Sequence, residues 1–503
     1  MSELSASTLK RLWRGGRQMP GKKPRALTSD RVREQLQLWD TRPRAKPTRP
    51  PKPGESWRRR LQHLLREDLS FEGQDTSYSR HNFHAFAAKF PPQLPQFFID
   101  HLTTEGETVL DPMMGSGTAV LEAALARRNG IGFDIDPLAV RICQIKTMPL
   151  ARERVESACH QAAASARRLL LDEARLRRHL DERFDAQTKA FVDYWFLPST
   201  QLELQALTES ISEVEEPGVR AFLEIAFSAS IVTKSGGVSL AMDLAHSRPH
   251  KVSSKVPRHA IDQFEQRVRK SLKGLAEPLP KGLVGVERAD ARSLPLSDHT
   301  VDLIVTSPPY ANAIDYVRAH KFSLVWLGES IGQLSELRSS YVGSEKASGE
   351  PLKEYGPISA SVLSELSRRD EKKRRVLSRY LRDMSAIFAE MLRVLRPGRC
   401  AVVVVGSSTM RGLDVQTDRC LAEVCSRLGW HVVGIAARRI DRDKRMMPMR
   451  RSAKAESQIE QRMSVESVIG MLKPSGISRL LKVGNSLCTA NCQNLYSCES
   501  FLS

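Results

Sequence analysis

The chain of 503 residues is too long for one ordinary domain core, and its 41% hydrophobic and 27% charged residues are typical of a globular protein. Its longest apolar stretches, such as Ala401 to Val405, are far shorter than the roughly 20 residues of a membrane-spanning helix, and no signal-peptide pattern follows Met1. These features exclude a membrane protein and favour the cytoplasm. The net charge of +19 favours a polyanionic partner, with nucleic acid as the leading candidate.

The N-terminal segment carries much of this charge. Residues 1–60 contain 17 Lys and Arg against 5 Asp and Glu. From Thr41 to Glu55 the sequence is basic and rich in proline, which cannot sustain a helix and is typical of an extended linker. We therefore expect residues 1–56 to form a flexible basic arm, which is either a solvated tail or a contact for nucleic acid.

The next residues predict two helices and then a strand, turn, helix and strand. Leucines with helical spacing predict a helix from Arg58 to Leu69, and a second helix is expected to start at Pro95. Thr108 to Leu110 is a short apolar strand, a glycine-bearing turn and a helix follow it, and Gly130 to Phe133 is a second strand. This series is typical of the first βαβ unit of a doubly wound parallel sheet.

Helical patterns then fill residues 151–279, with helices expected over Arg154 to Asp185 and Gln187 to Ile211. Further strands are expected at Leu283–Glu287, Val301–Thr306, Cys400–Gly406, Trp430–Ala437 and Ser467–Leu472, with a helix from about Lys373 to Leu395 and an antiparallel hairpin at the end. We predict an α/β fold in which a doubly wound, mostly parallel seven-stranded sheet, residues 57–150 and 280–474, is divided by a helical insertion, residues 151–279.

The eight cysteines are too few for a disulfide framework. Three of them, Cys488, Cys492 and Cys498, lie in the C-terminal tail, residues 475–503, and their spacing fits no common zinc site. The others stand singly, so we expect reduced, mostly buried thiols and no metal.

The turn DPMMGSGT, Asp111 to Thr118, has the features of a ligand-binding loop. Gly115 and Gly117 allow a tight turn, and the N–H groups of the following helix can bind an anion such as a carboxylate. The turn is neither a dinucleotide fingerprint nor a P-loop, which disfavours ATP hydrolysis. Asp134 ends the second strand, where an acid hydrogen-bonds the ribose of a nucleoside cofactor. A turn without a ligand is the alternative, but the two features together favour a pocket.

The segment TSPPY, Thr306 to Tyr310, ends an apolar strand, where open α/β sheets bind their ligands. Because prolines have no N–H, the carbonyls of Ser307 and Pro308 can point into a cleft as acceptors. Acceptors for an exocyclic amine, with Tyr310 to stack on its ring, suit a flipped nucleobase. A Pro-Pro turn with a packing tyrosine is the alternative.

Five segments in this order resemble the motifs of amino-methylating, S-adenosylmethionine-dependent DNA methyltransferases: AKFPP, VLDPMMGSGT, GIGFDIDP, DARSLPL and DLIVTSPPY. The resemblance covers roughly His81–Pro137 and Leu283–Pro474, and TSPPY is its most specific part. It implies the methyltransferase sheet and S-adenosylmethionine as the cofactor. Because the cofactor motifs precede TSPPY, the circularly permuted branch of the family is excluded.

The resemblance also implies roles for individual residues. The FPP segment and the glycine turn would hold the methionine part of the cofactor, Asp134 the ribose and Asp290 the adenine amino group. Met113 stands where the family often has phenylalanine and keeps an apolar contact. The implied cofactor-binding set is Phe90, Asp111, Pro112, Gly115, Gly117, Thr118, Asp134 and Asp290, and the implied catalytic set is Ser307, Pro308, Pro309 and Tyr310.

Ser307 favours cytosine N4 as the acceptor, because SPPY is typical of cytosine-N4 enzymes, whereas DPPY or NPPY is typical of adenine-N6 enzymes. The implied reaction is direct methyl transfer to a base flipped out of double-stranded DNA, with Ser307 and the Pro308 carbonyl accepting the amine N–H groups. It needs no cysteine nucleophile. Adenine-N6 methylation, RNA methylation by the same fold and non-catalytic nucleic-acid binding are the alternatives, and a restriction endonuclease is a candidate partner.

The helical insertion is the leading candidate for target recognition. Its segment Ala245 to Lys251, AHSRPHK, offers basic and imidazole donors for phosphates or base edges. Ile331 to Lys373 is a rival location, although its basic run from Arg368 to Arg375 is better explained as a solvated helix face. The basic stretch Arg438 to Lys454 is expected to follow the substrate backbone.

Overall fold

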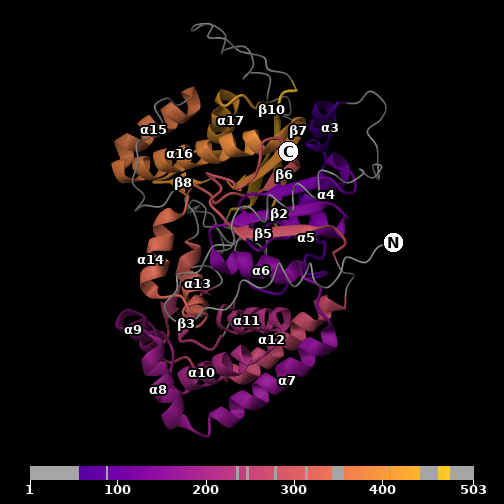
Figure 1. The fold of residues 1–503 in the computed structure, drawn as a ribbon. Helices are drawn as coiled ribbons and strands as arrows, with labels where there is room; N and C mark the ends of the chain where they lie inside the picture. Colours follow the sequence, from indigo (N-terminus) through magenta and orange to yellow (C-terminus); the bar gives the residue numbers. More distant parts are fainter. Residues whose placement is uncertain are drawn as a thin grey trace, which may run out of the picture.

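The structure is a computed structural model that describes residues 56–86, 89–233, 237–244, 249–276, 280–311, 315–342, 356–406, 408–441 and 463–475. Figure 1 shows a central sheet flanked by helices, with a further group of helices below it. Almost all of the predicted arm and tail lies outside the described residues. Among the helices that are described, none combines the length and the hydropathy needed to cross a membrane.

The central sheet contains seven strands in the order β10-β11-β7-β6-β1-β2-β5. From β7 to β5 neighbouring strands are parallel, whereas β11 is antiparallel to both β7 and β10. The chain order reverses between β1 and β6, and α/β sheets bind their ligands at such a switch point. The strands are β1 (Thr108–Asp111), β2 (Asn129–Asp134), β5 (Val284–Arg288), β6 (Val301–Thr306), β7 (Leu395–Gly406), β10 (His431–Arg439) and β11 (Val465–Leu472).

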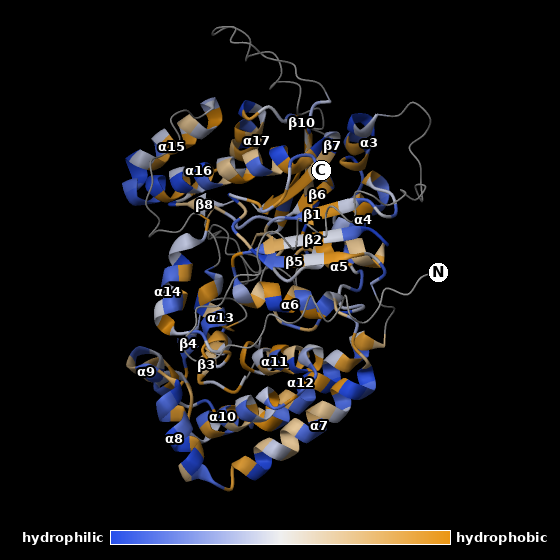
Figure 2. Cartoon of the chain, viewed as in Figure 1, coloured by the Kyte–Doolittle hydropathy of each residue, from blue (hydrophilic) through white to orange (hydrophobic). Residues whose placement is uncertain are grey.

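Helices cover both faces of the sheet, so its central strands are buried: every residue of β1 and β6 is buried, as is Cys400 to Gly406 of β7. Successive residues of β6 alternate between two cores: Leu303 packs with the first group of helices and Ile304 with the second. Figure 2 shows the contrast between the hydrophobic strands and the mixed outer helices. The first group is α3 (Trp57–Leu64), α4 (Gln93–Leu102) and α5 (Thr118–Leu125), and the second is α15 (Pro357–Arg369), α16 (Glu371–Val394) and α17 (Thr417–Arg427).

The helical insertion shares one hydrophobic core with helices next to the sheet. Phe227 of the insertion and Phe322 and Trp326, in and just after α13, are almost fully buried in that core. The insertion is therefore packed against the sheet region through α6, α13 and α14. Its elements are α7 (Arg152–Leu169), α8 (Glu173–Arg183), α9 (Ala186–Trp195), α10 (Pro198–Ser212), α11 (Pro217–Ile231), β3 (Ala241–Met242), β4 (His250–Lys251) and α12 (Ala260–Leu275), and its neighbours are α6 (Pro137–Thr147), α13 (Tyr316–Leu324) and α14 (Ile331–Ser340).

The predicted sheet is confirmed, including the antiparallel final hairpin, and β6 has the predicted bounds. A short ribbon of β8 (Thr409–Met410) and β9 (Leu413–Asp414) was not predicted. The five cysteines of the described residues are unpaired and buried, as expected.

Four helix predictions were wrong in their bounds. The helix expected from Arg58 to Leu69 is α3, which ends at Leu64. The helix expected to continue to Asp185 breaks between α7 and α8, because the Asp172 side chain accepts a hydrogen bond from the Arg175 backbone N–H and caps a new helix. The helix expected from Gln187 to Ile211 is divided into α9 and α10. The second of these begins at Pro198, whose fixed φ suits the first turn of a helix. Pro95 lies inside the first turn of α4, which begins at Gln93.

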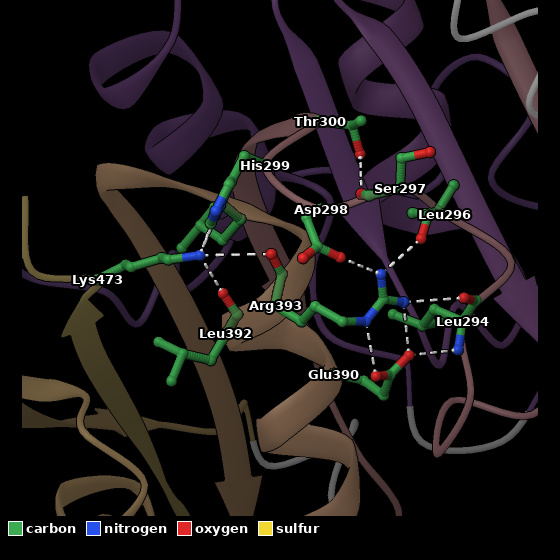
Figure 3. A network of polar contacts seen from close by, with 11 residues as sticks. Leu294, Leu296, Ser297, Asp298, His299, Thr300, Glu390, Leu392, Arg393 and Lys473 are labelled. Atoms are coloured by element: carbon green, nitrogen blue, oxygen red, sulfur yellow. Dashed lines mark hydrogen bonds and ion pairs between the residues drawn. The ribbon is translucent and has the colours of Figure 1, made fainter. Parts of the chain in front are cut away.

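A polar network holds the loop between β5 and β6 against α16 (Figure 3). Glu390 Oε2 accepts the backbone N–H of Leu294 at 2.8 Å, and the Arg393 guanidinium donates to the Leu294 carbonyl at 3.0 Å and to Glu390 at 2.7 Å. Lys473, just after β11, donates to backbone carbonyls at the end of α16, including that of Leu395 at 2.7 Å. The loop that begins with Asp290 is therefore fixed to α16.

Candidate active site

A pocket opens at the carboxyl ends of the parallel strands, where the strand order reverses. Its walls come from the loops that follow β1, β2, β5 and β6, from the segment before α4, and from residues next to α13 and α14. Nine of the predicted site residues line it: Phe90, Asp111, Pro112, Gly115, Thr118, Asp134, Asp290, Ser307 and Pro309. The other three, Gly117, Pro308 and Tyr310, are buried.

The glycine turn after β1 needs its glycines. Gly117 caps α5 with a φ of +74°, and a Cβ there would lie 2.2 Å from Cys143 Sγ on α6. Gly115 also has a positive φ of +50°, and a Cβ would come within 3.1 Å of Phe86. Side chains other than hydrogen are strained in this backbone region. The close approach of α6 and the phenylalanine thus explains why both positions are glycine.

A carboxyl group joins the glycine turn to the TSPPY segment. Thr306 Oγ1, at the end of β6, donates to Asp111 Oδ1 at 2.6 Å, and the same oxygen accepts the backbone N–H of Met113 at 3.2 Å. Burial raises the pKa of Asp111 to about 7, although the bond from Thr306 acts in the opposite direction. The ends of two neighbouring strands are therefore locked together beneath the pocket.

Two aspartates at the end of β2 and just after it, Asp134 and Asp136, shape the next part of the wall. Asp134 accepts the backbone N–H of Gly115 at 2.8 Å and that of Asp136 at 2.9 Å. Burial, and then the nearby Asp136 charge, raise the pKa of Asp134 to about 7. Asp136 caps α6 and lies 2.6 Å from Nδ1 of His320 on α13. Although burial opposes ionisation of Asp136, His320 and its hydrogen bonds leave the pKa of Asp136 lowered.

Two aromatic rings form an apolar wall that the sequence did not reveal. Phe86 and Tyr316 stack at 5.3 Å between ring centroids with an interplanar angle of 23°, and both line the pocket. Phe86 comes from the loop before α4, and Tyr316 begins α13. A flat apolar group of a ligand could pack beside them.

Successive residues of the TSPPY segment lie in turn at the pocket and in the protein interior. Ser307 and Pro309 are half-buried and line the pocket, whereas Pro308 and Tyr310 are buried. Tyr310 was expected to offer an aromatic face, but it is only 8% exposed, and its hydroxyl donates to Glu466 Oε1 at 2.5 Å. In this structure Ser307 and Pro309, rather than the tyrosine, line the pocket.

Asp290 lies in the pocket wall, but its carboxylate already has a partner. Arg292 Nε donates to Oδ1 at 2.9 Å and its Nη2 donates to Oδ2 at 2.6 Å, and the same guanidinium donates to the Ser340 carbonyl at the end of α14. A carboxylate oxygen has a second lone pair, so Asp290 can still accept a bond from a ligand.

A buried lysine supports the glycine turn from below. Lys146 of α6 is fully buried and its Nζ donates to the carbonyl of Ser116 at 2.8 Å. Burial lowers the pKa of Lys146 well below its usual value. Nearby, His81 lies 2.6 Å from Glu122, whose pKa burial raises to about 8. The turn thus rests on polar groups that no water reaches.

Sequence reasoning missed several of these residues. A signal existed for Asp136, because an acid before Pro137 is typical of a capped helix start. Phe86 and Tyr316 carried none, because only the fold brings them to the pocket, and Lys146 carried none, because only the fold brings it to the Ser116 carbonyl.

The basic stretch from Arg438 is not the exposed surface that was expected at its start. Arg438 is buried and its Nε donates to Glu466 Oε2 at 3.1 Å. Residues 442–454 of this stretch lie outside the described residues, as do Ala245 to Arg248 of the AHSRPHK segment. In the rival run Arg374 and Arg375 pair with Glu371, as expected for a solvated helix face.

Comparisons with known proteins agree with this geometry. Residues 18–145 match a family model described as DNA methylase, for N6 and N4 methyltransferases, and residues 225–324 match one described as RMKL-like, methyltransferase domain. The type II methyltransferase M.MvaI from Kocuria varians is 24% identical over 389 residues, 72% of this chain and 84% of that protein. M.BsoBI from Geobacillus stearothermophilus is 22% identical over 435 residues, 74% of this chain and 84% of that protein. The chain belongs to the amino-methylating DNA methyltransferases.

The cofactor of this methyltransferase is S-adenosylmethionine, and its substrate is DNA. Among solved structures, a SAM-dependent methyltransferase from Methanosarcina mazei aligns with a TM-score of 0.29 and 10% identity over 75% of this chain and 98% of that one, a likeness too weak to carry any part of the assignment. The matching family model covers both N6 and N4 methyltransferases, so the acceptor base is a separate question.

Proposed function

We propose that this methyltransferase methylates the exocyclic N4 amine of cytosine in double-stranded DNA. Ser307 carries the proposal, because it directly follows β6 and lines the same pocket as the cofactor turn. A serine hydroxyl is an acceptor for an amine N–H. The net charge of +19 supports a polyanionic substrate.

The residues of the pocket fit S-adenosylmethionine. Ser116 Oγ is buried in the pocket wall and has no hydrogen-bond partner among the described residues, so a polar group of the cofactor would satisfy it. The N-terminus of α5, at Thr118, would receive the carboxylate. Asp134 would accept the ribose hydroxyls with its remaining lone pairs, Asp290 would contact the adenine amine, and the wall of Phe86 and Tyr316 would cover apolar parts.

The protein's part in the chemistry is to orient an unreactive amine. The bound cofactor supplies a methyl group activated on a sulfonium. An exocyclic amine is a poor nucleophile because its lone pair is delocalised into the ring. Ser307 Oγ and the Pro308 carbonyl would accept its N–H groups and favour the pyramidal form with a free lone pair. The reaction needs no cysteine nucleophile, in keeping with five buried thiols in the described residues.

The base must leave the duplex to reach this pocket. We place target recognition in the helical insertion, residues 151–279, whose β3 to β4 hairpin holds Lys251 Nζ 4.0 Å above the ring of Tyr194. Tyr194 is 52% exposed, so the pair offers a cation and an aromatic face on the surface. Because relatives are type II methyltransferases, a restriction endonuclease is the partner that we propose.

The deciding experiment identifies the methylated nucleoside. The wild type, Ser307→Ala and the control Ser297→Ala, an exposed serine of the β5 to β6 loop, are incubated with labelled S-adenosylmethionine and mixed-sequence duplex DNA. The DNA is digested to nucleosides and analysed by mass. We expect N4-methylcytosine from the wild type and Ser297→Ala, and at least about a tenfold loss with Ser307→Ala.

Other outcomes are equally informative. N6-methyladenine would overturn the choice of base and keep the mechanism. Label in RNA but not in DNA would make RNA the substrate. A protein that does not bind the cofactor and does not transfer label would be a non-catalytic nucleic-acid-binding protein.

A further inference from the structure

The side chain of Tyr310 lies in a slot made by three strands that follow it in the sequence. Its ring packs against Ile440 and Met463, which follow β10 and precede β11. A Cβ at Gly406, the last residue of β7, would lie only 2.6 Å from the Tyr310 ring. The absence of a side chain at Gly406 therefore leaves the space that the ring fills.

The far end of the slot is a buried ion pair. The Tyr310 hydroxyl donates to Glu466 Oε1 at 2.5 Å, and Arg438 Nε donates to Glu466 Oε2 at 3.1 Å. The Arg438 side chain is 4% exposed and that of Glu466 12%. A carboxylate that is charge-paired in this way is a strong and directional acceptor.

The sheet register fixes where this acceptor lies. Glu466 is paired with Gly406 on β7 and with Arg438 on β10, so it sits in the middle of three strands. Its position is set by backbone ladders on both sides rather than by side-chain packing alone. The Tyr310 ring is thus held at two ends, by the stiff Pro308–Pro309 backbone and by a hydroxyl anchored in the sheet.

We infer that Glu466, paired with Arg438, is a positioning residue that sets the place of the Tyr310 ring for the target base. The inference rests on the proposed function, in which a flipped base is held beside TSPPY. The tyrosine hydroxyl is directed toward the sheet, so the anchor fixes the ring and, through the ring, the Pro308–Pro309 backbone next to Ser307. A phenylalanine at 310 would keep the ring and lose the anchor.

The test is a cycle of variants. Tyr310→Phe removes the hydroxyl, and the double variant Arg438→Met, Glu466→Met removes the anchor without leaving an unpaired buried charge. The triple variant combines them. A matched control, Glu365→Met with Arg369→Met, removes an ion pair of 2.8 Å on the surface of α15. Methyl transfer to duplex DNA, cofactor affinity by calorimetry and thermal unfolding are measured for each.

We expect Tyr310→Phe and the double variant each to lower kcat by about tenfold, the value of one charge-assisted hydrogen bond. The triple variant should be no slower than the double variant, because both changes break the same contact. The cofactor dissociation constant should stay within about twofold, since none of the three side chains lines the pocket. The control should match the wild type.

Two results would overturn the inference while the proposed function stands: a wild type that methylates DNA with additive losses in the triple variant, or losses of cofactor affinity as large as those of kcat. A wild type that transfers no methyl group to DNA would overturn the proposed function and the positioning role with it.

Discussion

The glycine turn after β1 and the TSPPY segment after β6 lie at the same edge of the sheet, but different parts of the chain hold them. The turn is held by neighbours in sequence: Gly115 bonds to Asp134, Ser116 bonds to Lys146, and Gly117 packs on α6. The TSPPY segment is held by residues far away in the chain, namely Asp111 of β1 and Glu466 of β11.

The contacts of the glycine turn lie within one short stretch of sequence, whereas those of the TSPPY segment form only when distant strands pair in the sheet. In the cofactor half of the pocket, the first βαβ unit supplies the glycine turn and Asp134, whereas Asp290, Phe86 and Tyr316 come from other parts of the chain. The substrate half needs the complete strand order, because β7, β10 and β11 all contribute to the slot of Tyr310. Substitutions in the cofactor half should therefore lower cofactor affinity, and substitutions in the substrate half should lower kcat.

The largest effect is expected from Gly117→Ala. The new Cβ would overlap Cys143 and take a positive φ, which together cost about 3 kcal/mol or more. Cofactor affinity should fall more than about 100-fold. Gly106→Ala is the matched control, because Gly106 has a φ of +81° but nothing within 4 Å of its Cβ. Calorimetric titration with S-adenosylmethionine measures the cofactor affinity of both variants. Equal losses of affinity would mean that the positive φ, rather than the overlap with Cys143, causes the effect.

Thr306→Val tests the hydrogen bond between Thr306 and Asp111, which links the two halves. Removing the hydroxyl leaves buried Asp111 without its strongest side-chain donor and should lower the free energy of unfolding by about 2 kcal/mol. Both cofactor affinity and kcat should decrease. Thr300→Val is the control, because it removes a comparable hydroxyl bond, to the Ser297 carbonyl, in an exposed loop.

The Thr306→Val effect should also depend on pH. Asp111 has a pKa of about 7 in the folded protein against 3.8 for an unperturbed aspartate, so stability is lost as the pH rises between these values. The Thr306 bond lowers this pKa, and without it the loss extends to higher pH. The variant should therefore be more destabilised, relative to the wild type, at about pH 8 than at about pH 6. Denaturant unfolding at both values would show a constant difference if Asp111 were not involved.

A smaller effect is expected from Lys146→Met. The variant loses the bond to the Ser116 carbonyl, worth about 1 kcal/mol, so cofactor affinity should fall about fivefold. Stability should change little, because methionine avoids the cost of a buried amine. Lys273→Met, at an exposed position of α12, is the control. A loss of kcat at saturating cofactor would contradict the assignment of Lys146 to the cofactor half.

The smallest effect is expected outside both halves, in the helical insertion. Lys251→Ala should weaken DNA binding about threefold and reduce the salt dependence by about one counterion. Tyr194→Phe keeps the ring beneath Lys251 and should bind like the wild type. Fluorescence anisotropy at several salt concentrations measures both. An unchanged salt slope in Lys251→Ala would remove this hairpin from the DNA interface.

The sequence predicted the sheet well because its strands are either apolar throughout or bounded by motifs. Val301 to Thr306 is a clear case, since both faces of β6 are buried. The helix breaks at Asp172 and Pro198 were missed although both residues are local signals, because the helical periodicity continues across them. The rest could not be predicted from local sequence. Phe86 and Tyr316, which stack on each other, are 230 residues apart in the sequence, and the partner of buried Arg438 is Glu466 on the neighbouring strand of the hairpin.

The position of β11 has a consequence for biosynthesis. This strand is the last of the sheet in sequence, yet it lies between β7 and β10. As the nascent chain leaves the ribosome, the β1 to α6 unit can assemble early, whereas the edge of β7 stays open until β11 arrives. Glu466 arrives with it, so the anchor for Tyr310 forms only when the sheet closes. A growing polypeptide would then bind the methyl donor before it can act on DNA, and a chain that ends before Val465 would expose an unpaired apolar edge and aggregate.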